Sequence, residues 1–121
     1  MRVLIIAAHG SRRKESNKEV VEMSKAVSKQ CAGYEKVHTA FLELALPSIE
    51  QCIDQAVGEG AKHITVFPYF LAAGRHVAED IPDIVVEKKE QYPNISIELA
   101  SYLGEAPRLP GLIADLLSSE Q

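Results

Sequence analysis

The chain has 121 residues, of which 46% are hydrophobic and 25% are charged. This length and balance predict one soluble globular domain over residues 1–121, with enough apolar side chains for a single core. The formal net charge of −4 argues against a general nucleic-acid binder, which would carry a basic surface. No apolar run reaches the roughly 20 residues that a membrane span needs, so we expect a cytoplasmic protein without a membrane role.

The first half of the chain alternates between strand-like and helix-like patterns. Residues 3–8 form a nearly continuous apolar run, which is typical of a strand covered on both faces of a parallel sheet. After a polar turn, a helix is predicted over 14–31, with one apolar side made by Val20, Met23, Val27 and Cys31. A second strand is predicted over 36–42. A second helix is predicted over 47–58, because Pro47 suits the first turn and glycines follow its last apolar position.

The second half repeats this alternation. A third strand is predicted over 63–69, followed by a helical stretch over 76–91. Pro82 should mark a kink or a restart of that helix, since proline cannot donate a hydrogen bond inside one. Apolar and polar residues alternate over 95–99, which indicates an edge strand. A closing helix is predicted over 109–117.

Strands that alternate with helices predict an α/β fold with a four-stranded parallel sheet, right-handed crossovers and helices on both faces. The compact doubly wound order for four strands is 2-1-3-4. Such sheets bind ligands beyond the carboxyl ends of their strands, at the point where the strand order reverses. His9 follows the first strand and His76 lies in the loop after the third. We therefore expect the two histidines to meet at this rim.

Two histidines on facing loops favour a metal-binding or acid–base role, since neutral imidazole is the commonest protein metal ligand. Glu43, at the end of the second strand, could add a carboxylate oxygen or accept a proton. A solvated carboxylate before the next helix is an equally good interpretation of Glu43. His38, inside the second strand, and His63, at the opposite rim, are interpreted as structural or surface histidines.

Basic side chains are predicted at the same rim. Arg12 and Arg13 follow Ser11 at the start of the first helix, and Arg75 precedes His76. Backbone N–H groups and the dipole of a helix start also favour anions. An anionic ligand is therefore plausible, and a solvated helix start is the simpler alternative.

Two other sequence features limit the chemistry. Cys31 and Cys52 are far apart and outside any C-x-x-C spacing, so we interpret both as small buried hydrophobes. None of the glycines forms a phosphate-cradling motif such as G-x-x-x-x-G-K. We expect neither a disulfide nor an organic cofactor.

The histidine loops lie in longer stretches that resemble the small sirohydrochlorin chelatases, which are single-domain class II tetrapyrrole chelatases. The matching stretches are 8–11 (AHGS), 40–49 (AFLELALPSI), 67–77 (FPYFLAAGRHV) and 80–82 (DIP). The third is the most specific, and the likeness covers essentially the whole chain. It implies the insertion of a divalent metal into sirohydrochlorin for cobalamin or siroheme biosynthesis. Cobalt is the first choice of metal, with iron or nickel as alternatives.

The resemblance also implies roles for single residues. His9 and His76 would bind the metal, which is a substrate, and Glu43 would share their catalytic cleft. The residues expected to bind the anionic macrocycle are Ser11, Arg12, Arg13 and Arg75. Which group accepts the pyrrole protons stays open. A homodimer is implied, with the partner completing the cleft.

Three functions other than metal insertion are compatible with some of these residues. A carrier or sensor of the same fold would bind metal without inserting it. A histidine phosphatase could use His9 beside Arg12 and Arg13, but Ala8 stands where that motif needs arginine. A serine hydrolase using Ser11 is disfavoured, because G-x-S-x-G is missing.

Overall fold

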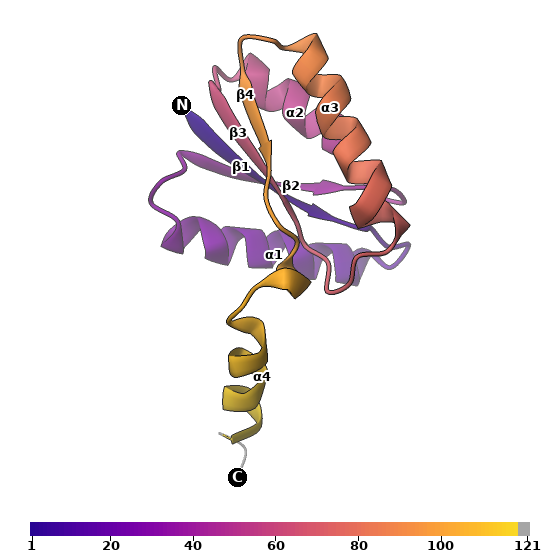
Figure 1. The fold of residues 1–121 in the computed structure, drawn as a ribbon, viewed down its shortest axis with the longest axis vertical. Helices are drawn as coiled ribbons and strands as arrows, with labels where there is room; N and C mark the ends of the chain where they lie inside the picture. The colour runs from indigo at the N-terminus through magenta and orange to yellow at the C-terminus, as the bar shows by residue number, and fades with distance from the viewer. Residues whose placement is uncertain (119–121) are drawn as a thin grey trace.

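The computed structural model describes residues 1–118. Its strands β1 (Arg2–Ala8), β2 (Lys36–Phe41), β3 (His63–Pro68) and β4 (Ser96–Leu99) form one parallel sheet in the order β2-β1-β3-β4 (Figure 1). The helices are α1 (Lys14–Gln30), α2 (Ile49–Gly58), α3 (Ile81–Gln91) and α4 (Leu109–Ser118). A π-helical turn, η1 (His76–Asp80), precedes α3, and a 3-10 turn, η2 (Leu103–Glu105), follows β4. The predicted α/β class and strand order are confirmed.

The main core lies on one face of the sheet. Side chains alternate along a strand, and Val3, Ile5 and Ala7 of β1 belong to this core. Helices α2 and α3 cover the same face (Figure 1), and α2 supplies Ile49 and Ile53, which are completely buried. Other core side chains come from β3, α3 and β4, namely Ile64, Val66, Ile81, Val85 and Ile97.

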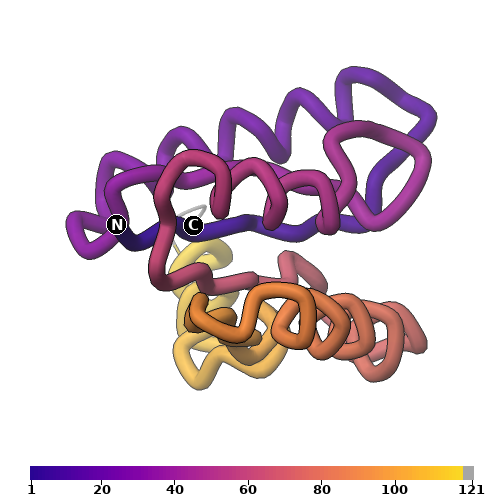
Figure 2. The backbone as a smooth tube through the Cα atoms, turned by 90° about the horizontal axis from the view of Figure 1, so that it is seen from above, coloured from indigo at the N-terminus to yellow at the C-terminus, as the bar shows by residue number. Residues whose placement is uncertain are grey.

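The other face of the sheet is covered less completely. Helix α1 packs there against β2, on the side of the strands away from α2 and α3 (Figure 1). Helix α4 does not complete this layer, because it buries none of its residues and projects away from the sheet. Figure 2 shows α1 and α3 on opposite sides of β1. Helices on both faces are thus confirmed, but the closing helix stands apart.

Local sequence signals explain the starts of α2 and α3. Helix α2 begins with a capping box, in which the Ser48 hydroxyl accepts from the Gln51 N–H at 3.1 Å and the Gln51 side chain accepts from the Ser48 N–H at 2.9 Å. Pro47 precedes this N-cap, so its predicted place in the first turn is wrong. Pro82 stands in the first turn of α3, directly after η1. The predicted restart of the helix there is confirmed.

The cysteines differ from each other in burial. Cys52 of α2 is 1% exposed, and burial raises the pKa of its thiol to about 11. Cys31 directly follows α1 and is only partly buried. The prediction of a buried cysteine is therefore right for Cys52 and wrong for Cys31. Both thiols are free. Within residues 1–118, no helix has the length and apolar character needed to cross a membrane.

Candidate metal site

The loop after β1 and the loop after β2 are joined by their backbones beyond the ends of the strands. The Leu42 N–H donates to the Ala8 carbonyl at 2.9 Å, and the Glu43 N–H donates to the His9 carbonyl at 3.0 Å. Gly10 makes this approach possible. Its φ of +97° lies in the left-handed region, and a Cβ there would be 1.8 Å from the Glu43 carbonyl oxygen. The chain thereby carries Glu43 to the side of His9.

Three side chains converge at this rim. The His9 Nε2 atom is 2.8 Å from Glu43 Oε2, and the His76 Nε2 atom is 4.0 Å from the same oxygen. The two imidazole rings are tilted by 46°, with centroids 4.9 Å apart. Among residues 1–118, these three form the one group of at least three His, Cys, Asp or Glu side chains whose ligand atoms all lie within 4.8 Å of one another.

Hydrogen bonds orient both imidazole rings. His9 Nδ1 is 3.0 Å from the Gly10 carbonyl oxygen, and His76 Nδ1 is 2.8 Å from Asp80 Oδ2. A carbonyl and a carboxylate accept hydrogen bonds, so each Nδ1 is the donor. Each ring therefore turns its Nε2 atom toward Glu43. Hydrogen bonding at one ring nitrogen decides which nitrogen is free to bind a metal.

The site is open to solvent. The exposed fractions of the His9, Glu43 and His76 side chains are 44%, 50% and 40%. Metal–nitrogen bonds of about 2.1 Å place tetrahedral ligands roughly 3.4 Å apart, so small side-chain shifts would bring these three onto one ion. Imidazole and carboxylate ligands suit cobalt, nickel, iron and zinc. Three protein ligands would leave part of the metal's coordination sphere open for exchange.

Two supporting residues were missed in the sequence. Asp80 orients His76, and its signal was the His-x-x-x-Asp spacing at a helix start, which brings the two side chains together. Asn17 holds Ser11: its Oδ1 accepts from the Ser11 N–H at 2.9 Å, and its Nδ2 donates to the Ser11 carbonyl at 2.8 Å. The Ser11 hydroxyl accepts from the Arg13 N–H at 3.0 Å. No sequence motif indicated Asn17.

The predicted basic residues lie on the same rim loops but extend into solvent. Arg12 and Arg13 are exposed just before α1. The Arg75 side chain is 80% exposed and lies 3.7 Å from Glu79. These cations therefore lie on the loops that carry His9 and His76, with their side chains in solvent.

The remaining histidines lie elsewhere, as predicted. His38 of β2 has its Nε2 atom 2.9 Å from Glu59 Oε1. His63 is the first residue of β3, at the amino-terminal end of that strand, and is exposed. Neither belongs to the group at the carboxyl rim.

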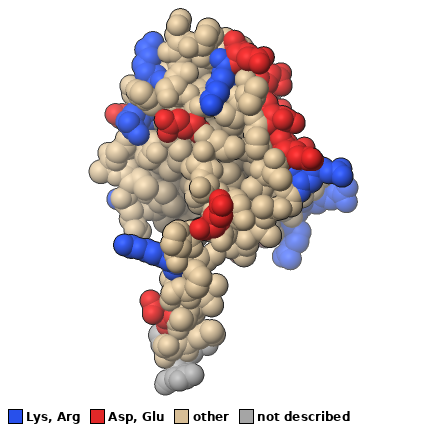
Figure 3. Space-filling view, viewed as in Figure 1, with Lys and Arg blue, Asp and Glu red and all other residues tan. Residues whose placement is uncertain are grey.

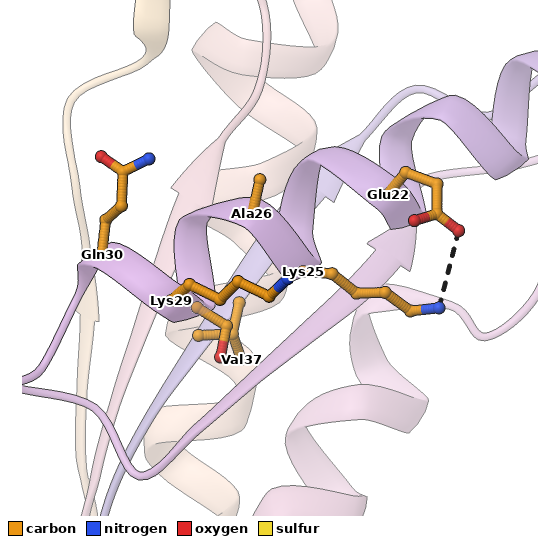
Figure 4. A pocket seen from close by; sticks show the side chains of 7 residues that line it. Glu22, Lys25, Ala26, Lys29, Gln30 and Val37 are labelled. Carbon is orange, nitrogen blue, oxygen red and sulfur yellow. Dashed lines mark ion pairs between the residues drawn. The ribbon is translucent and has the colours of Figure 1, made fainter.

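A separate depression of about 610 Å³ runs along α1 beside Val37 (Figure 4). It is lined by solvated side chains, including a Glu22–Lys25 ion pair of 3.6 Å. Val37 lies near the start of β2 and the lining residues of α1 lie in its second half. This depression therefore faces away from the carboxyl rim.

Comparison with known proteins identifies the relatives of this chain. The CbiX family model matches residues 3–120. The chain belongs to the CbiX family. A CbiX protein of cobalamin (vitamin B12) biosynthesis from Marinobacter aquaeolei has the same fold, with a TM-score of 0.85 and 31% identity, covering 99% of this chain and 97% of the other. The predicted family is thus confirmed for this CbiX chain.

Longer proteins also resemble this CbiX chain. The chloroplastic sirohydrochlorin ferrochelatase of Arabidopsis thaliana is 38% identical over 112 residues, which are 93% of this chain and 49% of that protein. The sirohydrochlorin chelatase SirB of Bacillus subtilis subspecies spizizenii, solved with cobalt, gives a TM-score of 0.85 at 25% identity, covering 98% of this chain and 50% of the other. Other relatives are named sirohydrochlorin cobaltochelatases. The chain spans about half the length of these two longer proteins.

Proposed function

We propose that this CbiX chain inserts a divalent metal ion into sirohydrochlorin. The observation that carries the proposal is the convergence of His9, Glu43 and His76, whose ligand atoms lie within 4.8 Å of one another at the carboxyl rim. The names of the relatives support the substrate, because they describe sirohydrochlorin chelatases that use iron or cobalt. Cobalt is our first choice of metal, with iron or nickel as alternatives.

Metal insertion requires ligands that bind the metal weakly and are exposed to solvent. The metal must lose water, be held over the macrocycle, and then leave the protein. Two imidazoles and one carboxylate, each 40–50% exposed, can bind an ion while leaving coordination positions for the pyrrole nitrogens. A closed four-ligand site would instead retain the metal, as structural zinc sites do.

Insertion also releases two protons from the pyrrole nitrogens. Glu43 is our candidate for taking one proton, and its support is that its Oε2 atom lies 2.8 and 4.0 Å from the Nε2 atoms that would hold the metal. Each histidine becomes a second acceptor once its metal bond is broken. We assign the acceptance of these protons jointly to Glu43 and the two histidines. No step of this scheme requires ATP.

The surroundings of His9, Glu43 and His76 suit a flat, anionic macrocycle. Exposed leucines lie on the loops that carry the ligands: Leu44 and Leu46 follow Glu43, and Leu71 precedes His76, with exposed fractions of 51%, 76% and 71%. Such side chains can contact the face of a ring. The side chains that we assign to the carboxylates of the macrocycle are Ser11, Arg12, Arg13 and Arg75.

We further propose that the chain acts as a homodimer, as the resemblance to the single-domain class II chelatases implies. A second copy would complete the cleft. A cytoplasmic location stays a prediction from the sequence.

The decisive experiment is an insertion assay. The purified protein is incubated without oxygen with sirohydrochlorin and cobalt, iron or nickel in turn, and the absorption spectrum of the macrocycle is followed. Insertion should exceed the uncatalysed rate, and His9→Ala or His76→Ala should remove most of the gain. His63→Ala is the matched control, because His63 is exposed at the other rim.

Two outcomes would contradict the proposal. Metal binding without faster insertion would indicate a carrier or sensor. Faster insertion that survives the loss of both His9 and His76 would place the chemistry at another site.

A further inference from the structure

A second, apolar groove opens on the face of the sheet that α1 covers only in part. Its volume is about 620 Å³, and none of the side chains that line it is charged. Strands β1 and β3 and helix α1 supply part of its lining, including Ile6, Phe67, Met23 and Val27. Met23 is 43% exposed although it belongs to the apolar side of α1. The groove therefore occupies the place beside α1 where a second helix would complete the layer.

Helix α4 carries an apolar surface without a partner layer. All of its residues from Pro110 to Ser118 are exposed, and Asp115 is its one charged residue. Leu112, Ile113 and Leu117 recur on one side of the helix and are 53%, 51% and 62% exposed. Figure 3 shows this helix as a nearly uncharged stalk that leaves the body of the molecule. Exposed apolar surface of this extent marks an interaction site.

The first turn of α4 lies at the groove. Leu109 and Leu112, in the first turn of α4, contribute to the lining of the groove. The helix is continuous from Leu109 to Ser118, and it points away from the sheet (Figure 1). Its last turns therefore cannot enter the groove of their own chain while the first turn keeps its place.

We propose that α4 of one copy lies in the groove beside α1 of a second copy, and that the second copy returns the same contact. The inference rests on the homodimer of the proposed function and specifies how that dimer is made. A groove and a helix of matching apolar character on one chain satisfy the requirement of a two-fold interface, in which each copy offers both surfaces.

Sedimentation velocity on the full chain tests the contact. The protein should sediment as a dimer, and Ile113→Asp should raise the dimer dissociation constant by about 100-fold or more, because a charge then enters an apolar contact. Ala114→Asp is the matched control: it adds the same charge to the same helix, about 100° further round and outside the apolar side. Circular dichroism checks that both variants are folded.

Cross-linking distinguishes an exchanged helix from another kind of dimer. One chain carries Met23→Cys and the other Leu117→Cys, both with Cys31→Ser, and the mixture is treated with a short bis-maleimide. A covalent dimer of the two different chains is expected. In a chain that carries both new cysteines, links should again form between chains.

Each other result overturns the inference. A monomeric wild type, a dimer that Ile113→Asp does not weaken, or a link formed within one chain would each contradict it. The insertion assay, run on the same wild-type sample, shows separately whether the proposed function holds.

Discussion

His76 Nδ1 and Asp80 Oδ2 lie 2.8 Å apart, at the two ends of the π-helical turn η1. Single π turns are frequent at functional sites, and this one sets a carboxylate behind an imidazole whose other nitrogen faces Glu43. A carboxylate in this place fixes the ring orientation and makes the free nitrogen a better metal ligand. The relationship makes Asp80 a positioning residue in our proposed site.

Asp80→Ala should therefore weaken cobalt binding by about 10–100-fold, as measured by titration calorimetry, with little change in thermal stability. Glu79→Ala is the matched control, because Glu79 is the neighbouring carboxylate and lies 3.7 Å from Arg75. Asp80→Asn should recover part of the affinity, since its amide oxygen can still accept from Nδ1. Equal affinity for wild type and Asp80→Ala would show that His76 needs no such support.

Gly10→Ala should destabilise the fold and displace Glu43. The φ of +97° at this position is strained for alanine, and the new methyl group would overlap the Glu43 carbonyl oxygen. We expect the free energy of unfolding to fall by at least about 1–3 kcal/mol, as measured by urea denaturation, together with slower metal insertion. Gly33→Ala is the control, because no heavy atom beyond its two chain neighbours lies within 4 Å of its added carbon. If Gly10→Ala were as stable as Gly33→Ala, a side chain at position 10 would not clash with the Glu43 carbonyl oxygen, and the prediction would be wrong.

The fold could be predicted from the sequence because its strands and helices have distinct hydrophobic periods. The continuous apolar run over 3–8 and the regular spacing of apolar residues in α2 could each be interpreted without knowledge of other parts of the chain. The strand order then placed His9 and His76 at one rim by a general rule of open sheets. The place of α4 was not predictable in this way. Its apolar spacing indicates a buried side, but the spacing contains no information about which chain buries it.

The details of the site depended on contacts that sequence patterns do not encode. Glu43 reaches His9 through backbone hydrogen bonds beyond the strand ends, and these bonds require the close approach at Gly10. Asn17 supports Ser11 through its amide group, from a position that has no distinguishing spacing. The residues of the proposed metal site were thus easier to identify than those that hold them in place.

The two cysteines should differ in their reaction with a maleimide in the folded protein. Cys52 is 1% exposed, and burial raises the pKa of its thiol to about 11, so both its access and its thiolate fraction are low. Cys31 is only partly buried at the end of α1. Mass spectrometry should find Cys31 modified first and Cys52 modified only after unfolding. Simultaneous labelling under native conditions would show that α2 opens locally.

Glu59 should make the stability of the protein depend on pH. Its carboxylate accepts a hydrogen bond from His38 and pairs with Lys36 at 3.1 Å, and the first of these contacts lowers its pKa most, from the ordinary value of 4.5. A lowered pKa in the folded state means that the unfolded chain binds a proton first as the pH falls. The stabilisation is therefore complete above the unfolded value and is lost as the pH falls through the folded value.

Glu59→Gln should accordingly lower the free energy of unfolding by about 0.5–1 kcal/mol near neutral pH, and the difference from wild type should shrink as the pH falls below the ordinary value of 4.5. Urea denaturation over a pH series measures it, with the exposed Glu90→Gln on α3 as the control. A difference that stays constant down to the lowest pH at which the protein folds would mean that the charge of Glu59 is not what stabilises the junction of β2 and α2. No difference at any pH would mean that the carboxylate acts only as a hydrogen-bond acceptor, a role that glutamine can fill.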